Sequence, residues 1–264
     1  MSVRLFYFAF VLLLFISNNT INSGISSNTN YTKPQASQTK IANNNTGLFE
    51  TYIKRSYDNL QLGQKKLHYE AYKNGLIGYY NLLSQNKVAA PKYLSIADFE
   101  QASTEKRLYI IDVQKNTLVK QTWVAHGKNS GNNFAQNFSN TAESYQSSLG
   151  FYLTAETYSG KHGYSLRFDG IEQNINDRAR ERAIVMHGAD YVSKSFIQQQ
   201  GRLGRSFGCP AVSEEESAEI INLIKDGSVF YIYKNDKSYL QLTHLLQYSI
   251  ALTAYERLLG TVRS

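Results

Sequence analysis

The chain has 264 residues, 42% of them hydrophobic, which is enough for one domain with its own core plus an accessory segment. Its formal charge is +7, but the basic residues are scattered and form no run of five or six. We therefore expect an ordinary basic surface and no nucleic-acid partner. The single cysteine excludes an internal disulfide and a four-cysteine zinc site.

The first 47 residues predict export followed by a linker. Arg4 precedes an apolar run over residues 5–16, which is long enough for a secretory signal and too short to cross a bilayer. We predict a signal peptide over 1–23, with an uncleaved anchor as the alternative, and a protein of the periplasm or cell envelope. Residues 24–47 are rich in Asn, Ser and Thr and predict a disordered linker.

Residues 48–97 have leucines and tyrosines at three- and four-residue spacing, which predicts a helical lead-in. Gly63 and Gly75 indicate breaks between two or three short helices. The tail, residues 236–264, is leucine-rich with helical spacing and predicts an amphipathic helix that packs on the domain or on a partner.

Residues 98–235 predict the catalytic domain, an α+β fold rich in β-sheet. Alternating patterns indicate a hairpin, two short strands and a last strand, at 107–113 with 117–125, 151–154, 165–168 and 229–233. A charged helical crossover is expected over 174–182 and a helix over 214–225. The apolar run 183–186 predicts a buried strand that ends at His187.

The only cysteine, Cys209, lies in the loop 201–210, which contains three glycines and a proline and comes just before the helix expected from 214. A tight loop presents its side chains, so we expect Cys209 at its tip. A nearby helix N-terminus, arginines and an imidazolium would all lower the pKa of the thiol. The loop therefore predicts a nucleophilic cysteine.

The segment from His187-Gly188 to Ser206-Phe207-Gly208-Cys209 resembles the signature of the L,D-transpeptidases (YkuD-type), cysteine enzymes that remodel bacterial peptidoglycan. Two positions depart from the usual pattern. Phe207 replaces a His, and Ala211 stands where an Asn or Arg is usual. The form Gly-Arg-Ser-x-Gly-Cys-Pro-Ala is similar to a divergent branch of this family.

The resemblance implies roles for the residues of the signature. Cys209 would be the nucleophile and His187 the base, and the backbone carbonyl of Gly188 would orient the imidazole, with Asp190 as a carboxylate alternative. The backbone N–H groups of Gly208 and Cys209 would form the oxyanion hole.

Five further residues are predicted to bind substrate. Arg205 and Arg202 precede the nucleophile and suit a carboxylate of a peptide stem, although solvated surface arginines are the alternative. Ser206 would hydrogen-bond either its own loop or the substrate. His126 and His162, each followed by glycine, resemble positions that the branch retains around its cleft.

The implied reaction is attack by Cys209 on the carbonyl between the L-centre of diaminopimelate and D-Ala in a tetrapeptide stem. D-Ala leaves, and the amine of a second stem resolves the thioester. We expect peptidoglycan stem peptides as partners, and no cofactor or metal.

Three alternatives remain open. Water in place of the amine would make the protein an L,D-carboxypeptidase. The changes at Phe207 and Ala211 would suit a non-catalytic wall-binding protein. A zinc site of His126, His162 and His187 is the third alternative, although the spacing of the three matches no local zinc motif. A papain-like protease is excluded, because its cysteine precedes its histidine.

Overall fold

A computed structural model describes residues 35–263 of the chain, with side chains from 47 to 260. The expected signal peptide and residues 24–34 of the expected linker lie outside the described residues. Within residues 35–263, no helix combines the length and the apolar character needed to cross a membrane.

The core is an eight-stranded mixed sheet with the strand order β3-β2-β1-β8-β4-β5-β6-β7. Two neighbouring pairs, β1 with β8 and β6 with β7, are parallel, and the other pairs are antiparallel. The strands are β1 (Tyr93–Asp98), β2 (Leu108–Asp112), β3 (Thr117–Thr122), β4 (Gly150–Gly160), β5 (Gly163–Gly170), β6 (Val185–Ala189), β7 (Ala211–Ser213) and β8 (Val229–Tyr233).

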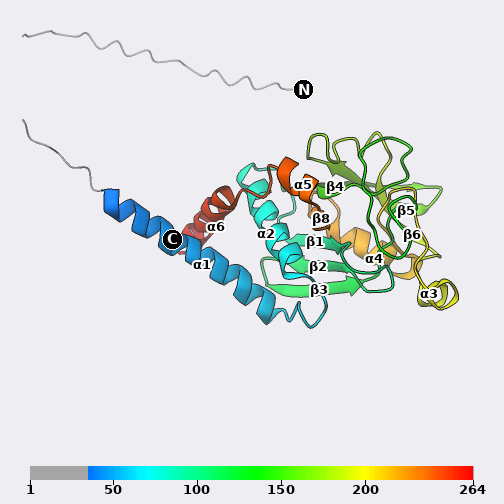
Figure 1. The fold of residues 1–264 in the computed structure, drawn as a ribbon, viewed down its shortest axis with the longest axis horizontal. Helices are drawn as coiled ribbons and strands as arrows, with labels where there is room; N and C mark the ends of the chain where they lie inside the picture. Colours follow the sequence, from blue (N-terminus) through cyan, green and yellow to red (C-terminus); the bar gives the residue numbers. More distant parts are fainter. Residues whose placement is uncertain (1–34, 264) are drawn as a thin grey trace, which may run out of the picture.

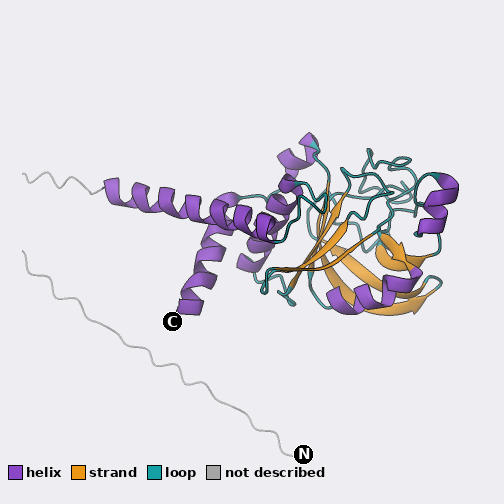
Figure 2. Ribbon diagram, turned by 90° about the horizontal axis from the view of Figure 1, so that it is seen from below, coloured by secondary structure: helices purple, strands orange, loops and turns teal. Residues whose placement is uncertain are grey.

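Six helices complete the described fold: α1 (Gln35–Asn59), α2 (Tyr69–Ser84), α3 (Lys194–Gln200), α4 (Glu214–Ile224), α5 (Lys237–Leu242) and α6 (Tyr248–Arg263). Helices α1, α2 and α6 lie together at one end of the molecule, and β5 and β6 lie at the other (Figure 1). In Figure 2 the long helices lie to the left of the sheet, and the long loops lie above its strands. The α+β fold with helices before and after a sheet-rich core is therefore confirmed.

Helix α2 packs closely on the sheet because two of its glycines face the strands. A Cβ on Gly75 would lie 2.9 Å from Ile96 Cδ1, and one on Gly78 would lie 2.0 Å from Phe151 Cζ. Gly75 therefore permits close packing in the middle of α2, and the predicted helix break there is wrong. The break at Gly63 is confirmed, since it lies in the turns between α1 and α2.

Helix α4 begins as its sequence indicates. Ser213 caps it by accepting a hydrogen bond from the Glu216 N–H at 3.3 Å, and Glu214, Glu215 and Glu216 occupy its first turn. Acidic side chains there complement the helix dipole. The predicted hairpin, the helix from 214 and the strand 229–233 are also present.

Several other predicted elements differ. Helix α1 already begins at Gln35, inside the expected linker 24–47. Once the C-terminal half of a helix is packed, each further residue adds a hydrogen bond and costs only its own conformational entropy, so the helix extends easily toward its N-terminus. Strand β1 lies inside the expected helical lead-in 48–97. Residues 174–182 form successive turns in place of a helix, with left-handed backbone at Asn174 and at Ala183 just after them. The tail forms two helices, α5 and α6.

Candidate active site

Cys209 and His187 line one cavity of about 430 Å³ beside β6, the strand that carries His187. His162 joins them from the turn between β4 and β5. The walls come from three further segments, the loops around 143–145 and 182–185 and the loop 205–209. Residues far apart in the chain thus converge on the thiol.

His187 lies on β6, paired with Ser165 of β5 on one side and with Ala211 of β7 on the other. It is the third residue of this five-residue strand, where a strand-end position was expected. Its Nδ1 lies 2.8 Å from the Gly188 carbonyl oxygen. Since a carbonyl only accepts, Nδ1 carries the proton, and Nε2 of the neutral ring is left with a free lone pair.

The imidazole of His187 stacks on that of His162, with ring centroids 4.4 Å apart and an angle of 26° between the planes. Burial lowers the pKa of His187, and the hydrogen bond to Gly188 only partly opposes this effect. His187 is therefore a neutral imidazole at pH 7, which is the form that accepts a proton.

The Cys209 thiol is held between backbone groups. Sγ donates to the Ala183 carbonyl oxygen at 3.7 Å, and a backbone hydrogen bond from Val185 favours the thiolate. Burial nonetheless raises the pKa of Cys209. The expected lowering of this pKa is thus wrong, for two physical reasons. Burial outweighs the groups that favour the thiolate, and His187 carries no charge at rest.

The cations that favour the Cys209 thiolate are Arg182 and Lys161, and the arginines expected from the sequence are not among them. Arg205 lines the cavity and donates through Nη1 to the Gly131 carbonyl at 2.9 Å. Arg202 lies outside the cavity lining and donates to the Leu203 carbonyl at 2.7 Å. The structure therefore brings Arg205, but not Arg202, to the cavity lining.

Ser206 organises the nucleophile loop. Its buried hydroxyl donates to the Cys209 carbonyl at 2.6 Å and accepts from the Gly208 N–H at 3.0 Å. Of the two roles expected for Ser206, these hydrogen bonds correspond to the first, bonding within its own loop, and not to substrate binding. The Gly208 N–H is therefore already engaged inside the loop.

His126 does not reach the cavity. It is fully buried, with Nδ1 2.7 Å from Nη2 of the buried Arg107. Burial, reinforced by the Arg107 charge, lowers the pKa of His126 to about 3. His126 also holds the nucleophile loop, because its backbone carbonyl accepts a hydrogen bond from the Ser206 N–H at 3.0 Å. Its place is structural.

Sequence reasoning missed several residues that line the cavity: Arg182, Lys161, Glu143 and the aromatic side chains of Tyr145, Tyr158 and Tyr191. Lys128 does not line the cavity itself, but its ammonium lies over two rings that do. It is 4.2 Å from the ring centroid of Tyr145 and 4.5 Å from that of Phe207. Phe207, which replaces the usual His, is 61% exposed at this rim. Only the charge of the segment 174–182 hinted at Arg182.

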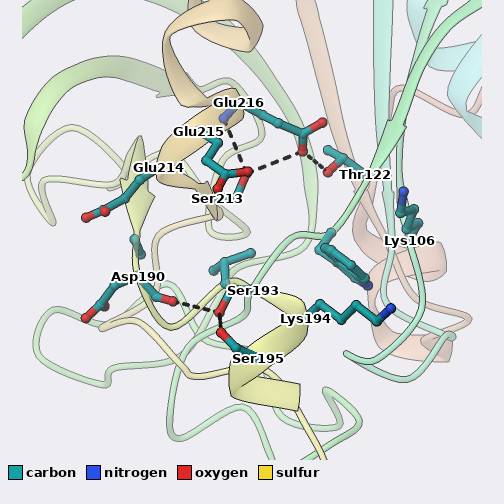
Figure 3. Close-up of a pocket in the computed structure, with 13 residues that line it drawn as sticks. Lys106, Thr122, Asp190, Ser193, Lys194, Ser195, Ser213, Glu214, Glu215 and Glu216 are labelled. Carbon is teal, nitrogen blue, oxygen red and sulfur yellow. Dashed lines mark hydrogen bonds between the residues drawn. The ribbon is translucent and has the colours of Figure 1, made fainter. Parts of the chain in front are cut away.

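A second hollow lies on the other side of the loop that follows β6 (Figure 3). Asp190 lines it together with Ser193 and the acidic first turn of α4. Asp190 is therefore not part of the lining of the Cys209 cavity, and the Gly188 carbonyl is the group that orients His187. Among the described residues, no three His, Cys, Asp or Glu side chains gather as they would around a metal ion.

An α+β domain that brings one cysteine and one oriented histidine into a single cleft defines a narrow class of proteins. The family model described as the L,D-transpeptidase catalytic domain matches residues 63–233, and the chain belongs to this family. Its members act on peptidoglycan stem peptides in the cell envelope. The match begins at residue 63, before the expected boundary at 98, and so includes α2 and β1.

Several solved structures are similar to part of this chain, at low sequence identity. An L,D-transpeptidase from Mycobacterium smegmatis is 12% identical, with a TM-score of 0.35 over 54% of this chain and 59% of that one. Bd1075 from Bdellovibrio bacteriovorus is 15% identical, with a TM-score of 0.36 over 64% and 56%. An L,D-transpeptidase from Xylanimonas cellulosilytica is 13% identical, with a TM-score of 0.34 over 53% and 60%. The chain thus spans a little over half the length of these structures. A search of curated proteins found no match.

Proposed function

We propose that the protein is a cysteine-dependent L,D-transpeptidase that acts on tetrapeptide stems of peptidoglycan. The observation that carries the proposal is the shared cavity of Cys209 and His187, with His187 Nδ1 held by the Gly188 carbonyl. This hydrogen bond leaves Nε2 free to take a proton, which a thiol must lose before it can attack a carbonyl.

In the proposed reaction, His187 takes the Cys209 proton as Sγ attacks the carbonyl between the L-centre of diaminopimelate and D-Ala. The C–N bond breaks, D-Ala leaves with the proton from His187, and a thioester remains on Cys209. An acceptor amine then attacks the thioester, so that a new amide bond forms as the C–S bond breaks. His187 takes the proton of the amine and passes it to the leaving Cys209 thiolate. The Cys209 N–H would stabilise the oxyanion, with the Gly208 N–H joining it only if Ser206 releases it.

The charge of the cavity suits an anionic donor. Lys161, Arg182 and Arg205 line it against the single carboxylate of Glu143. Ammonium and guanidinium groups bind carboxylates, which a peptide stem carries. His162 would contact the donor or support His187 through their stacked rings. The apolar run after Arg4 supports export through a signal peptide, with an uncleaved anchor as the alternative.

Purified tetrapeptide stems incubated with the protein test the proposal. Wild type should release D-Ala, Cys209→Ala should release none, and His187→Ala should lose at least about a hundredfold in rate, the usual contribution of a general base. His244→Ala, a change at an exposed histidine near α6, is the matched control and should retain the wild-type rate. Release of D-Ala by Cys209→Ala would refute the mechanism.

The mass of the second product separates the two enzymatic alternatives. A cross-linked dimer of stems indicates transpeptidation, and free tripeptide indicates L,D-carboxypeptidase activity. A wild-type protein that binds stems and releases no D-Ala would instead be a non-catalytic wall-binding protein.

A further inference from the structure

One short segment, residues 182–187, supplies most of the groups around the Cys209 thiol. The Ala183 carbonyl accepts from Sγ, Val185 provides a backbone hydrogen bond, and His187 shares the cavity. Arg182 begins this segment. Its position relative to the thiol is set by Ala183, whose φ of 53° turns the chain sharply before β6.

The Arg182 guanidinium joins this segment to the loop 139–148. Nη1 donates to the Ser139 carbonyl at 2.7 Å and to the Ser148 hydroxyl, and Nη2 donates to the Gln146 carbonyl at 2.6 Å and to the Ser144 hydroxyl at 3.3 Å. A planar fork of fixed donors can hold such a set, whereas the single ammonium of lysine cannot. Arg182 therefore restrains the loop at four points.

The same guanidinium lies against the residue before the nucleophile. Gly208 has a φ of +122°, and a Cβ added to it would lie 3.3 Å from Arg182 Nη2 and 2.8 Å from the Gln146 carbonyl oxygen. Arg182 and the loop that it holds thus pack directly on the backbone next to Cys209. Arg182 also favours the thiolate electrostatically.

A fixed cation matters here because the imidazole of His187 is neutral at rest and cannot offset a thiolate charge. Lys161 is the other cation that acts on Cys209, but it is exposed at the tip of the β4–β5 hairpin. Arg182 is partly buried and held by four hydrogen bonds, so its charge is screened less by water.

We propose that Arg182 is a positioning residue of this site: it clamps the loop 139–148 against Gly208 and keeps a positive charge beside Cys209 that stabilises the thiolate. The catalytic consequence rests on the proposed function. The charge effect does not, because alkylation of Cys209 measures it without any substrate.

The test compares the full chain with Arg182→Gln, Arg182→Lys and, as the matched control, Arg180→Gln. Arg180 lies two residues away and pairs with Asp169 and Glu156 at the surface. The rate of Cys209 alkylation by iodoacetamide is followed by mass from pH 6 to pH 10, and D-Ala release from tetrapeptide stems is measured alongside.

Arg182→Gln should raise the apparent pKa of the Cys209 thiol by about one unit, which slows alkylation at pH 7 about tenfold. Arg182→Lys keeps the charge and loses the fork. Its thiol should therefore titrate as in wild type, while its kcat falls about tenfold. Arg180→Gln should change neither property. A thiol that titrates as in wild type in folded Arg182→Gln would overturn the proposal.

If Arg182→Gln does not fold, Arg182→Lys decides the matter, since wild-type turnover in that variant also overturns the proposal. Failure of the proposed function is distinguishable, because a wild-type protein that releases no D-Ala still yields the alkylation profiles.

Discussion

Three histidines of this chain have three different environments. His187 is oriented by a carbonyl in the cavity, His162 stacks on it from an exposed hairpin tip, and His126 is buried against the guanidinium of Arg107. Arg107 donates to the Val124 and Gln101 carbonyls as well, so its charge is fixed in place. The pair makes His126 a neutral, purely accepting partner at Nδ1.

The environment of His126 predicts acid sensitivity. Its pKa is about 3 in the folded state and about 6.5 in an unfolded chain. Between these values the unfolded state binds the additional proton, so the free energy of unfolding falls as the pH falls from 6.5 toward 3. Wild type should lose about 2.5 kcal/mol from this histidine between pH 6.5 and 4.5.

Urea unfolding of wild type and of His126→Asn at both pH values measures this contribution. The variant should be less stable at pH 6.5 and should lack that part of the pH dependence. His244→Asn, at an exposed histidine, should keep the wild-type dependence. Parallel pH profiles of wild type and His126→Asn would show that His126 has the same pKa in the folded and the unfolded protein.

At the residue scale, the sequence locates Cys209 and His187 because their motif is local and chemically specific. It does not locate Arg182, because the approach of its guanidinium to Gly208 depends on the left-handed turn at Ala183 and on the loop 139–148. The sequence also predicts, wrongly, that His126 lies in the cleft. A histidine followed by glycine has the same sequence pattern whether it is buried or exposed.

At the scale of elements, Glu172 attaches the C-terminal tail to the sheet. Its buried carboxylate accepts from the Phe151 N–H at 2.6 Å at the start of β4, and from the Tyr239 hydroxyl of α5 at 3.3 Å. The Thr243 hydroxyl after α5 donates to its other oxygen. Burial raises the pKa of Glu172, and these hydrogen bonds oppose that shift.

Glu172→Ala should therefore loosen the tail. The change leaves the Phe151 N–H and the Tyr239 hydroxyl without their partner, and the free energy of unfolding should fall by about 3 kcal/mol, from about 1–3 kcal/mol for each unsatisfied group. Glu181→Ala, at an exposed carboxylate, should change it by less than about 1 kcal/mol. Urea unfolding checks both. A loss below about 1 kcal/mol for Glu172→Ala would mean that water replaces its hydrogen bonds.

Elements with a strong local pattern are predictable from this sequence, such as β2 with β3 and the capped helix α4. Strand β1 is not, because it is nearly all buried and lacks alternation, and its parallel partner β8 lies far along the chain. The turns over 174–182 are also not predictable from the sequence, since a charged composition alone does not distinguish a helix from successive turns.

At the scale of the whole molecule, an aromatic cluster joins α1 and α2 to the last helix, α6. Phe49 of α1 is fully buried, with ring centroids 5.6 Å from Tyr80 of α2 and 5.0 Å from Tyr255 of α6. Tyr52 stacks on Tyr255 at 4.6 Å. This cluster lies at the end of the molecule opposite to β5 and β6 (Figure 1). The aromatic cluster and the elements that carry His187 thus lie in different parts of the fold.

Phe49→Ala tests this separation. Removing a fully buried phenylalanine should lower the free energy of unfolding by about 3–5 kcal/mol, measured in urea. The matched change Phe207→Ala, at a ring that is 61% exposed, should lower it by less than about 1 kcal/mol. Under conditions where Phe49→Ala remains folded, the pH profile of Cys209 alkylation should equal that of wild type, because none of the groups around the thiol contacts the aromatic cluster. A shifted profile in that variant would show that α1, α2 and α6 also control the geometry of the nucleophile loop.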